Sequence, residues 1–194
     1  MSGEHHHDGS IAQRVRALET ALEERRLVDD AELDAILDRM RTPEDGARVV
    51  AHAWADPAFR ERLLGDGTAA VEELGYSMTG GVRPQVLIVL ENTERVHNVV
   101  VCTLCSCYPI ALLGPSPPWY KSEAYRARVV REPRAVLQEF GLRLAPSVEV
   151  RVWDSSAETR YLVLPRRPAE TDACSEAELA TMVTRNGMIG TAAL

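Results

Sequence analysis

Apolar residues recur at helical spacing along residues 1–75 of the chain. Arginines and glutamates separate the apolar positions, as in amphipathic helices. Because these helices carry few large side chains, we do not expect them to form a compact core alone. A helical bundle and an extended arm both fit this pattern. We favour a helical arm over residues 1–42, followed by a second domain over residues 43–194. The clearest stripe consists of Ile11, Val15, Leu18 and Leu22.

Further along the chain, the pattern changes to that of strands. Residues 86–90 form a continuous apolar run, which suits a strand covered on both faces. Residues 148–153 alternate in polarity, residues 160–164 form another strand, and the polar segment 154–158 between them predicts a hairpin. The capping box that begins at Ser175 predicts a late helix. The fold class is therefore α+β, with an N-terminal helical arm followed by a domain of small β-sheets covered by helices.

The charge of the chain argues against several classes of partner. Its 194 residues include 22 Lys and Arg against 29 Asp and Glu, which gives a formal net charge of −7. Phosphate binding needs clustered cations, so we expect no nucleic acid partner. No stretch approaches the ~20 apolar residues of a bilayer span, and the N-terminus lacks the apolar region of a signal peptide. We therefore expect a cytoplasmic protein without a membrane partner, and we assign no chemistry to residues 5–7.

Three of the four cysteines fall within the segment Cys102-Thr103-Leu104-Cys105-Ser106-Cys107. In a reducing compartment, such crowding indicates metal or redox chemistry rather than a disulfide framework. Zinc prefers four tetrahedral ligands, usually in two separated pairs, and the second pair is missing here. A four-cysteine iron–sulfur cluster would also lack a clear fourth ligand, since Cys174 stands alone in a polar loop.

The Cys-Ser-Cys spacing permits a different metal site. The sulfurs of Cys105 and Cys107, together with the backbone nitrogens of Ser106 and Cys107, can close small chelate rings around one ion in a plane. Cys102 can add an axial thiolate and leave one position open. This donor set suits a trivalent metal of octahedral preference, such as cobalt or iron. The open position is where a substrate or a water would bind.

Residues 101–109 closely resemble the metal-claw motif of the nitrile hydratase α-subunit family, which includes the related metal subunit of thiocyanate hydrolase. The resemblance covers roughly residues 45–190. The other segments that carry it are 91–93, 96–100, 119–122, 125–134, 152–156, 160–161 and 188–190.

The resemblance implies an enzyme, a nitrile hydratase of the carbon–oxygen lyase class, which hydrates a nitrile to its amide. The metal ligands would be Cys102, Cys105 and Cys107 with the amide nitrogens of Ser106 and Cys107. Cys105 would be oxidised to the sulfinate and Cys107 to the sulfenate. Cys107, Cys105 and Ser106 would then form the catalytic centre. Thr103 is typical of the cobalt type, so the resemblance implies one trivalent cobalt per chain rather than iron.

The resemblance also implies partners and supporting residues. A β-type subunit, as one chain or two smaller ones, would supply arginines to the oxidised sulfurs, so the chain would be active only with it. An activator protein that delivers cobalt is a further expected partner. Asp154, Glu158 and Arg160 would form a network around the metal ligands that holds them in position. Without the resemblance, a solvated hairpin would be the preferred interpretation of these three residues.

Other residues near the claw have simpler interpretations. His97 is expected to be a hydrogen-bonded structural residue rather than a ligand, because the open position must stay open. Trp119 and Tyr120 are expected to pack under the claw loop. Ile110 and Ala111 stand where the family usually carries Trp-Pro. The smaller side chain should enlarge the substrate pocket and favour a bulky, aromatic or heteroaromatic nitrile.

Two other functions compete with a nitrile hydratase. The first is the metal subunit of a thiocyanate hydrolase, which shares the claw but produces carbonyl sulfide and ammonia. The second is a non-catalytic subunit that binds zinc through its cysteines. Assays of both substrates distinguish the two enzymes, and metal analysis distinguishes the zinc protein.

Overall fold

The computed structural model describes residues 5–25, 44–78, 85–104 and 107–194. The predicted ligands Cys105 and Ser106 lie outside these residues. The chain divides into two units, residues 1–39 and residues 40–194.

In the first unit, the predicted amphipathic helix is present as α1 (His5–Glu24). Its stripe residues Ile11, Val15 and Leu18 are exposed by 54%, 46% and 61%. The role of this helix as an arm stays a prediction.

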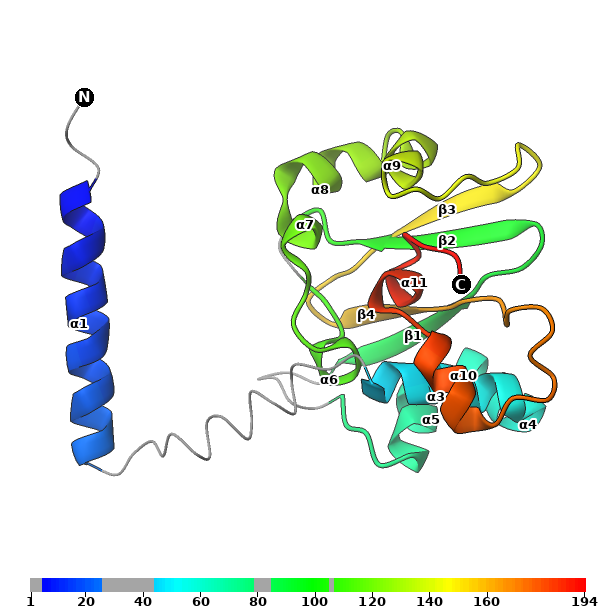
Figure 1. The fold of residues 1–194 in the computed structure, drawn as a ribbon, viewed down its shortest axis with the longest axis horizontal. Coiled ribbons are helices and arrows are strands. Elements are labelled where there is room, and N and C mark those ends of the chain that lie inside the picture. The colour runs from blue at the N-terminus through cyan, green and yellow to red at the C-terminus, as the bar shows by residue number, and fades with distance from the viewer. Residues whose placement is uncertain (1–4, 26–43, 79–84, 105–106) are drawn as a thin grey trace. The chain divides into compact units, whose positions relative to one another are not determined.

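The described residues of the second unit form four strands in two parallel pairs (Figure 1). The strand β1 (Val86–Glu91) pairs with β4 (Thr159–Leu164), and β2 (Val96–Val101) pairs with β3 (Glu149–Asp154). The predicted hairpin is therefore wrong, because β3 and β4 belong to different pairs. Alternation identifies a strand but not its partner, and both late strands pair with the apolar segment 86–101. The mixture of helices and small sheets confirms the predicted fold class.

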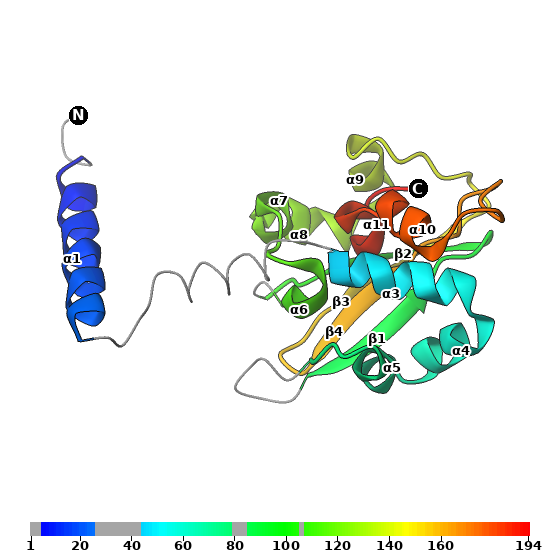
Figure 2. The ribbon, with the colours of Figure 1, turned by 60° about the horizontal axis from the view of Figure 1, so that its bottom comes forward.

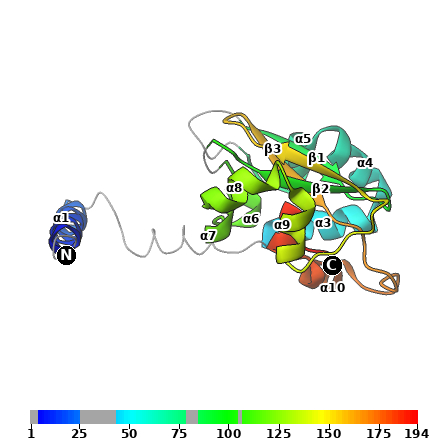
Figure 3. The same cartoon turned by 90° about the horizontal axis from the view of Figure 1, so that it is seen from above.

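Short helices cover one side of the strands and their ends. Figure 2 shows α4 and α5 beside β1 and α10 beside α3, and Figure 3 shows α8 and α9 on the side of β3. The helices of this unit are α3 (Glu44–Ala55), α4 (Pro57–Gly65), α5 (Gly67–Glu73), α6 (Ile110–Leu113), α7 (Pro118–Lys121), α8 (Glu123–Val129), α9 (Pro133–Glu139), α10 (Glu176–Met182) and α11 (Arg185–Ile189).

The helix starts follow the sequence signals. Asp56 caps α4 by accepting hydrogen bonds from the backbone N–H groups of Ala58 and Phe59, at 2.8 and 3.2 Å. The capping box of Ser175 and Glu178 is formed at the start of α10, as predicted. These caps satisfy backbone donors that would otherwise lack an intrahelical partner. Within the part of the chain that the structure describes, no helix is both long and apolar enough to cross a membrane.

The strand β1 is covered on one face only within this chain. Leu87 and Val89 are buried, whereas Val86 and Ile88 are exposed by 52% and 39%. The expectation of a strand covered on both faces is therefore wrong. A continuous apolar run is equally compatible with a strand whose second face is exposed in this unit.

The backbone at the end of the C-terminal helix α11 lies in close contact with β2. Gly190 adopts φ +87°, and a Cβ atom there would lie 2.0 Å from the carbonyl oxygen of Asn98. Only glycine fits both the left-handed conformation and this approach. The contact brings the Gly190 carbonyl against His97, at the start of β2.

Candidate functional site

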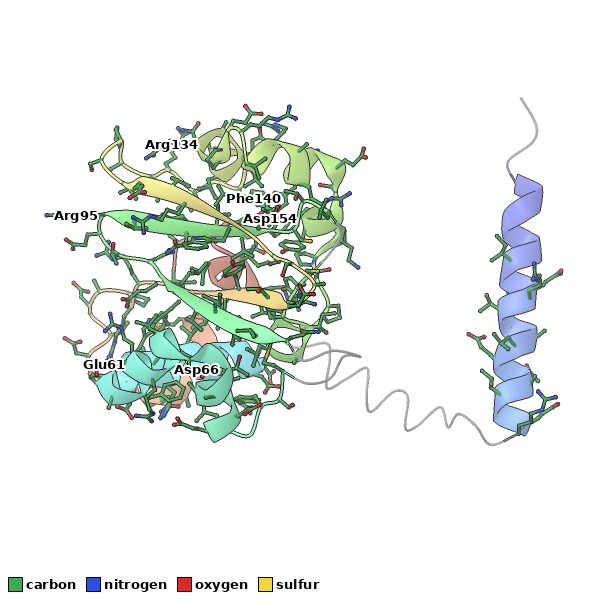
Figure 4. The ribbon with its side chains drawn as sticks, turned by 180° about the vertical axis from the view of Figure 1, so that it is seen from behind. Glu61, Asp66, Arg95, Arg134, Phe140 and Asp154 are labelled. Atoms are coloured by element: carbon green, nitrogen blue, oxygen red, sulfur yellow. The ribbon has the colours of Figure 1, made fainter. Side chains whose placement is uncertain are left out.

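The predicted metal-binding segment begins where β2 and β3 end side by side. Val101 is paired with Asp154 in the register of the two strands, and the backbone N–H of Ser155 donates to the Val101 carbonyl at 2.8 Å. Cys102 follows directly and is 1% exposed. Figure 4 labels Asp154 at this end of β3. The parallel pairing thus brings two segments far apart in the sequence to the same point.

Asp154 holds the backbone immediately after Cys102. Its carboxylate accepts the Thr103 backbone N–H at 2.9 Å and the Thr103 hydroxyl at 2.5 Å. These two bonds fix both the main chain and the side chain of Thr103. The Thr103 amide is thus engaged as a donor within the fold.

Tyr120 of α7 holds the other end of the segment. Its hydroxyl donates to the carbonyl oxygen of Cys107 at 3.0 Å. Burial raises the pKa of Tyr120, and the nearby Tyr108, Cys102 and Cys107 raise this pKa further. The hydroxyl therefore stays protonated and can donate to Cys107. Tyr120 thus contacts the loop as the sequence indicated, whereas the Trp119 ring packs against Tyr120 and Phe140, with centroids 6.0 and 4.6 Å away.

Two hydroxyls near these cysteines are buried and form no hydrogen bond of normal geometry with the residues that the structure describes. They belong to Ser155, 6% exposed, and Tyr108, 4% exposed. The Ser155 hydroxyl lies close enough to Tyr120 to lower the pKa of that phenol against the effect of burial. Buried polar groups without partners are uncommon and call for an explanation. Sequence reasoning missed both residues, although Ser155 directly follows Asp154.

Glu158 and Arg160 stabilise the connection between β3 and β4. Arg160 is 8% exposed. Its Nη1 donates to the carbonyls of Ser156, Ala157 and Thr159, the last two at 3.2 Å. The Glu158 carboxylate accepts the Ser156 hydroxyl at 3.3 Å. These contacts shape the turn that follows Asp154, and a direct role of the two residues behind the ligands stays a prediction.

His97 lies at the opposite end of β2 and is 6% exposed. Its Nε2 donates to the Gly190 carbonyl at 2.8 Å, and its Nδ1 accepts from the Asn92 amide at 3.3 Å. Burial lowers the pKa of His97, against a smaller raising effect of the bond to Gly190. Both ring nitrogens are thus used within the fold, as expected for a structural histidine.

Ile110 and Ala111 begin α6, shortly after Cys107, and both are exposed. Two cavities of about 300 and 320 Å³ lie where β1 and β4 end. The residues that line both cavities are Asn92, Pro165, Arg166 and Arg167. The assignment of Ile110 and Ala111 to a substrate pocket therefore stays a prediction.

The described residues do not by themselves form a complete metal site. Among the residues that the structure describes, no group of three or more His, Cys, Asp or Glu could hold a metal ion, and the central Cys105 is not one of them. Cys102 and Cys107, the outer predicted ligands, both raise the pKa of Tyr120, and the Cys107 carbonyl accepts the Tyr120 hydroxyl. Cys174 lies in the loop before α10, where its backbone N–H donates to the Thr171 carbonyl at 3.0 Å.

Comparisons with known proteins identify similar chains. A family model described as nitrile hydratase, alpha chain, matches residues 9–192. The α subunit of the low-molecular-weight cobalt-containing nitrile hydratase of Rhodococcus rhodochrous is 51% identical over 183 residues, which cover 93% of this chain and 87% of that protein. The γ subunit of thiocyanate hydrolase from Thiobacillus thioparus is 46% identical over 158 residues, 77% of this chain and 65% of that protein. A solved mutant of the Fe-type nitrile hydratase from Comamonas testosteroni Ni1 superimposes with a TM-score of 0.85 at 45% identity, covering 96% of this chain and 91% of that one.

Proposed function

Because the chain belongs to the nitrile hydratase α-chain family and is therefore an enzyme subunit, we propose that it is the metal-carrying subunit of a cobalt-type nitrile hydratase. The observation that carries the proposal is the segment from Cys102 to Cys107. It starts at the end of a buried strand and is held on one side by Asp154 and on the other by Tyr120. The reaction adds water across the carbon–nitrogen triple bond of a nitrile and gives the amide.

We propose trivalent cobalt, one ion per chain, as the metal. The residues that would hold it are Cys102, Cys105 and Cys107, with the amide nitrogens of Ser106 and Cys107. Thr103 and the cobalt-containing relative support cobalt, although an Fe-type enzyme has a similar structure. Bound cobalt would supply a Lewis acid that polarises the nitrile or makes a water molecule more acidic.

The chain's own residues supply positioning and proton transfer. Hydration requires a group beside the nitrile carbon that attacks it or accepts a proton from the attacking water. The sulfenate oxygen of Cys107 is the proposed group, and Cys105 as a sulfinate would stand beside it. Asp154 keeps Thr103 in place, and Glu158 and Arg160 stiffen the turn behind Asp154. Such supporting contacts typically control metal affinity or activity by 10–100-fold.

We propose that a β-type partner, as one chain or two smaller chains, completes the site. Oxidised sulfurs need positioned cationic donors. In this chain, Arg160 is engaged by the carbonyls of its own turn, and Arg185 donates to the Leu113 carbonyl at 2.9 Å. The partner would therefore supply the arginines that hold Cys105 and Cys107, and an activator protein would deliver the cobalt.

Coexpression tests this function. The chain purified with a β-type partner from cobalt-supplemented cells should convert nitriles to amides, and the chain alone should have little activity. Full turnover by the single chain would contradict the role of the partner. A complex that contains cobalt but hydrates no nitrile would contradict the proposed reaction.

A second candidate is the metal subunit of a thiocyanate hydrolase, which the 46% identity to such a subunit supports. The same complex should then release carbonyl sulfide and ammonia from thiocyanate rather than amide from a nitrile. Zinc in place of cobalt, together with no activity on either substrate, would favour a non-catalytic metal-binding subunit.

We also propose that Ile110 and Ala111 line the substrate pocket of the complex. Their side chains are exposed close to Cys107 in the sequence, and Ile110 is 41% exposed. An indole in place of the Ile110 side chain would occupy more of the space beside the claw. The smaller residues therefore favour a bulky, aromatic or heteroaromatic nitrile.

A further inference from the structure

We propose that Tyr120 is a positioning residue of the metal centre, whose hydroxyl fixes Cys107 and thereby the geometry of the bound cobalt. The inference rests on the proposed function, because it assumes that Cys107 is a ligand. Tyr120 would not touch metal or substrate and would act through Cys107 alone.

Tyr120 contacts two consecutive residues at the end of the claw. Its hydroxyl donates to the Cys107 carbonyl at 3.0 Å. Its ring meets the ring of Tyr108 edge-on, with centroids 5.1 Å apart. The hydrogen bond sets the plane of the peptide after Cys107, and the ring contact sets the direction in which the chain leaves. Together they restrict the backbone of Cys107 and the direction in which its sulfur points.

Tyr120 is itself rigidly held. It is fully buried, at 0% exposure, in the short helix α7. The helix begins with Pro118, and the Tyr120 backbone N–H donates to the Pro117 carbonyl at 3.0 Å. Its ring lies 6.0 Å from that of Trp119 and 5.9 Å from that of Tyr125. A contact made by a side chain without freedom to move is a defined restraint on its partner.

The claw, residues 102–107, is thus held by a carboxylate at its start and by a phenol hydroxyl at its end. Asp154 binds Thr103, directly after the first cysteine, and Tyr120 binds Cys107, the last one. Without the Tyr120 hydroxyl, the Cys107 carbonyl loses this hydrogen bond, and we expect the end of the loop to be less restrained. The ligand field of the metal depends on where this sulfur and this amide lie, so the change should be visible in the spectrum of the bound cobalt.

Tyr125 offers a matched control. Its hydroxyl is also buried and donates to a backbone carbonyl, that of Val100 in β2, at 2.7 Å. Its ring belongs to the same aromatic cluster, 4.9 Å from Trp119. Tyr125→Phe therefore removes the same kind of hydrogen bond in the same surroundings, but from the strand rather than from the claw.

The experiment compares Tyr120→Phe, Tyr125→Phe and the wild type, each purified as the cobalt-loaded complex. Thermal unfolding measures the general cost of the lost hydroxyl. The sulfur-to-cobalt charge-transfer absorption and the rate of cobalt loss to a chelator report on the site. Both variants should unfold at similarly lowered temperatures. Only Tyr120→Phe should shift the absorption and lose cobalt faster, by about 10–100-fold.

The outcomes separate the two proposals. If Tyr120→Phe keeps the wild-type absorption and cobalt retention while its stability falls like that of Tyr125→Phe, Tyr120 is merely structural. If the wild-type complex contains no cobalt, the proposed function fails, and the positioning role fails with it. Should Tyr120→Phe not fold, a fluorinated tyrosine at position 120 keeps the ring and strengthens the donor. It should shift the absorption, whereas an unchanged absorption would overturn the inference.

Discussion

The two ends of β2 use their buried polar groups in opposite ways. At the start of the strand, the chain completes its own hydrogen bonds. His97 binds the Gly190 carbonyl at 2.8 Å, and the Asn98 side chain accepts the Trp153 indole N–H at 2.9 Å. At the other end, Asp154 and Tyr120 hold the backbone, whereas the buried hydroxyls of Ser155 and Tyr108 form no hydrogen bond of normal geometry with the described residues.

This difference distinguishes a structural site from a functional one. A buried polar network whose donors and acceptors pair within the chain stabilises the fold and requires no ligand. We interpret the buried hydroxyls at the end of the strand as part of the surroundings of the metal that we propose at the cysteines. Substitutions at the start of β2 should therefore change stability, whereas substitutions at its end should change the metal.

The largest effect is expected at the cysteines. Serine at position 102, 105 or 107 should abolish bound cobalt and activity in the complex, because each removes a proposed thiolate ligand. Cys174→Ser should do neither, since Cys174 lies in the separate loop before α10. Loss of cobalt in Cys174→Ser, with cobalt retained in the other three variants, would show that the ligands are wrongly assigned.

Asp154→Asn should have the next largest effect. The amide keeps the size of the carboxylate but weakens both bonds to Thr103, of which the shorter is 2.5 Å. Cobalt affinity or kcat should fall by about 10–100-fold, with a small change in unfolding temperature. Glu149→Gln provides a control on the same strand, because Glu149 forms an exposed ion pair with Arg151. If both substitutions lowered cobalt affinity or kcat equally, the two ends of β2 would not differ in function as we propose.

A smaller effect is expected from Ile110→Trp. The indole should reduce the space beside the claw and raise KM for bulky nitriles about tenfold, in the range that pocket shape can supply. Small aliphatic nitriles should be affected less. Steady-state kinetics of the complex with both kinds of nitrile check the prediction. Unchanged preferences would show that Ile110 does not line the pocket.

At the other end of β2, His97→Gln should leave the cobalt content of the folded complex unchanged. It should lower the free energy of unfolding by about 1–3 kcal/mol, because buried partners lose their hydrogen bonds.

The wild type should also lose stability as the pH falls below the ordinary histidine pKa of 6.5, because burial keeps folded His97 neutral while the unfolded chain takes up a proton. Urea unfolding at several pH values should show that His97→Gln weakens this dependence. A loss of cobalt in this variant would contradict the structural role of His97.

Much of the fold follows from local patterns. The caps at Asp56 and Ser175 begin α4 and α10 where the sequence indicates, because capping is decided within one turn of helix. The pairing of the strands does not follow. Segment 155–158 is short and polar like a hairpin, yet it joins two different sheets. Its role depends on contacts of β3 and β4 with residues far away in the sequence.

The same limit applies to the candidate site. The spacing of Cys102, Cys105 and Cys107 suggests a ligand set by itself, and the family resemblance of residues 101–109 is confirmed by the match over residues 9–192. The hydrogen bond that holds Cys107 comes from Tyr120 of α7, thirteen positions later, and the spacing of the cysteines cannot reveal this contact. Tyr120 could be predicted to pack under the loop, but not to bind its backbone.

The most direct test of the account is the metal content and intact mass of the chain, purified with its partner from cobalt-supplemented cells. We predict one cobalt ion per chain and a mass increase of three oxygen atoms, two on Cys105 and one on Cys107. Zinc in the complex, or cobalt bound to a site that survives serine at positions 102, 105 and 107, would contradict the account.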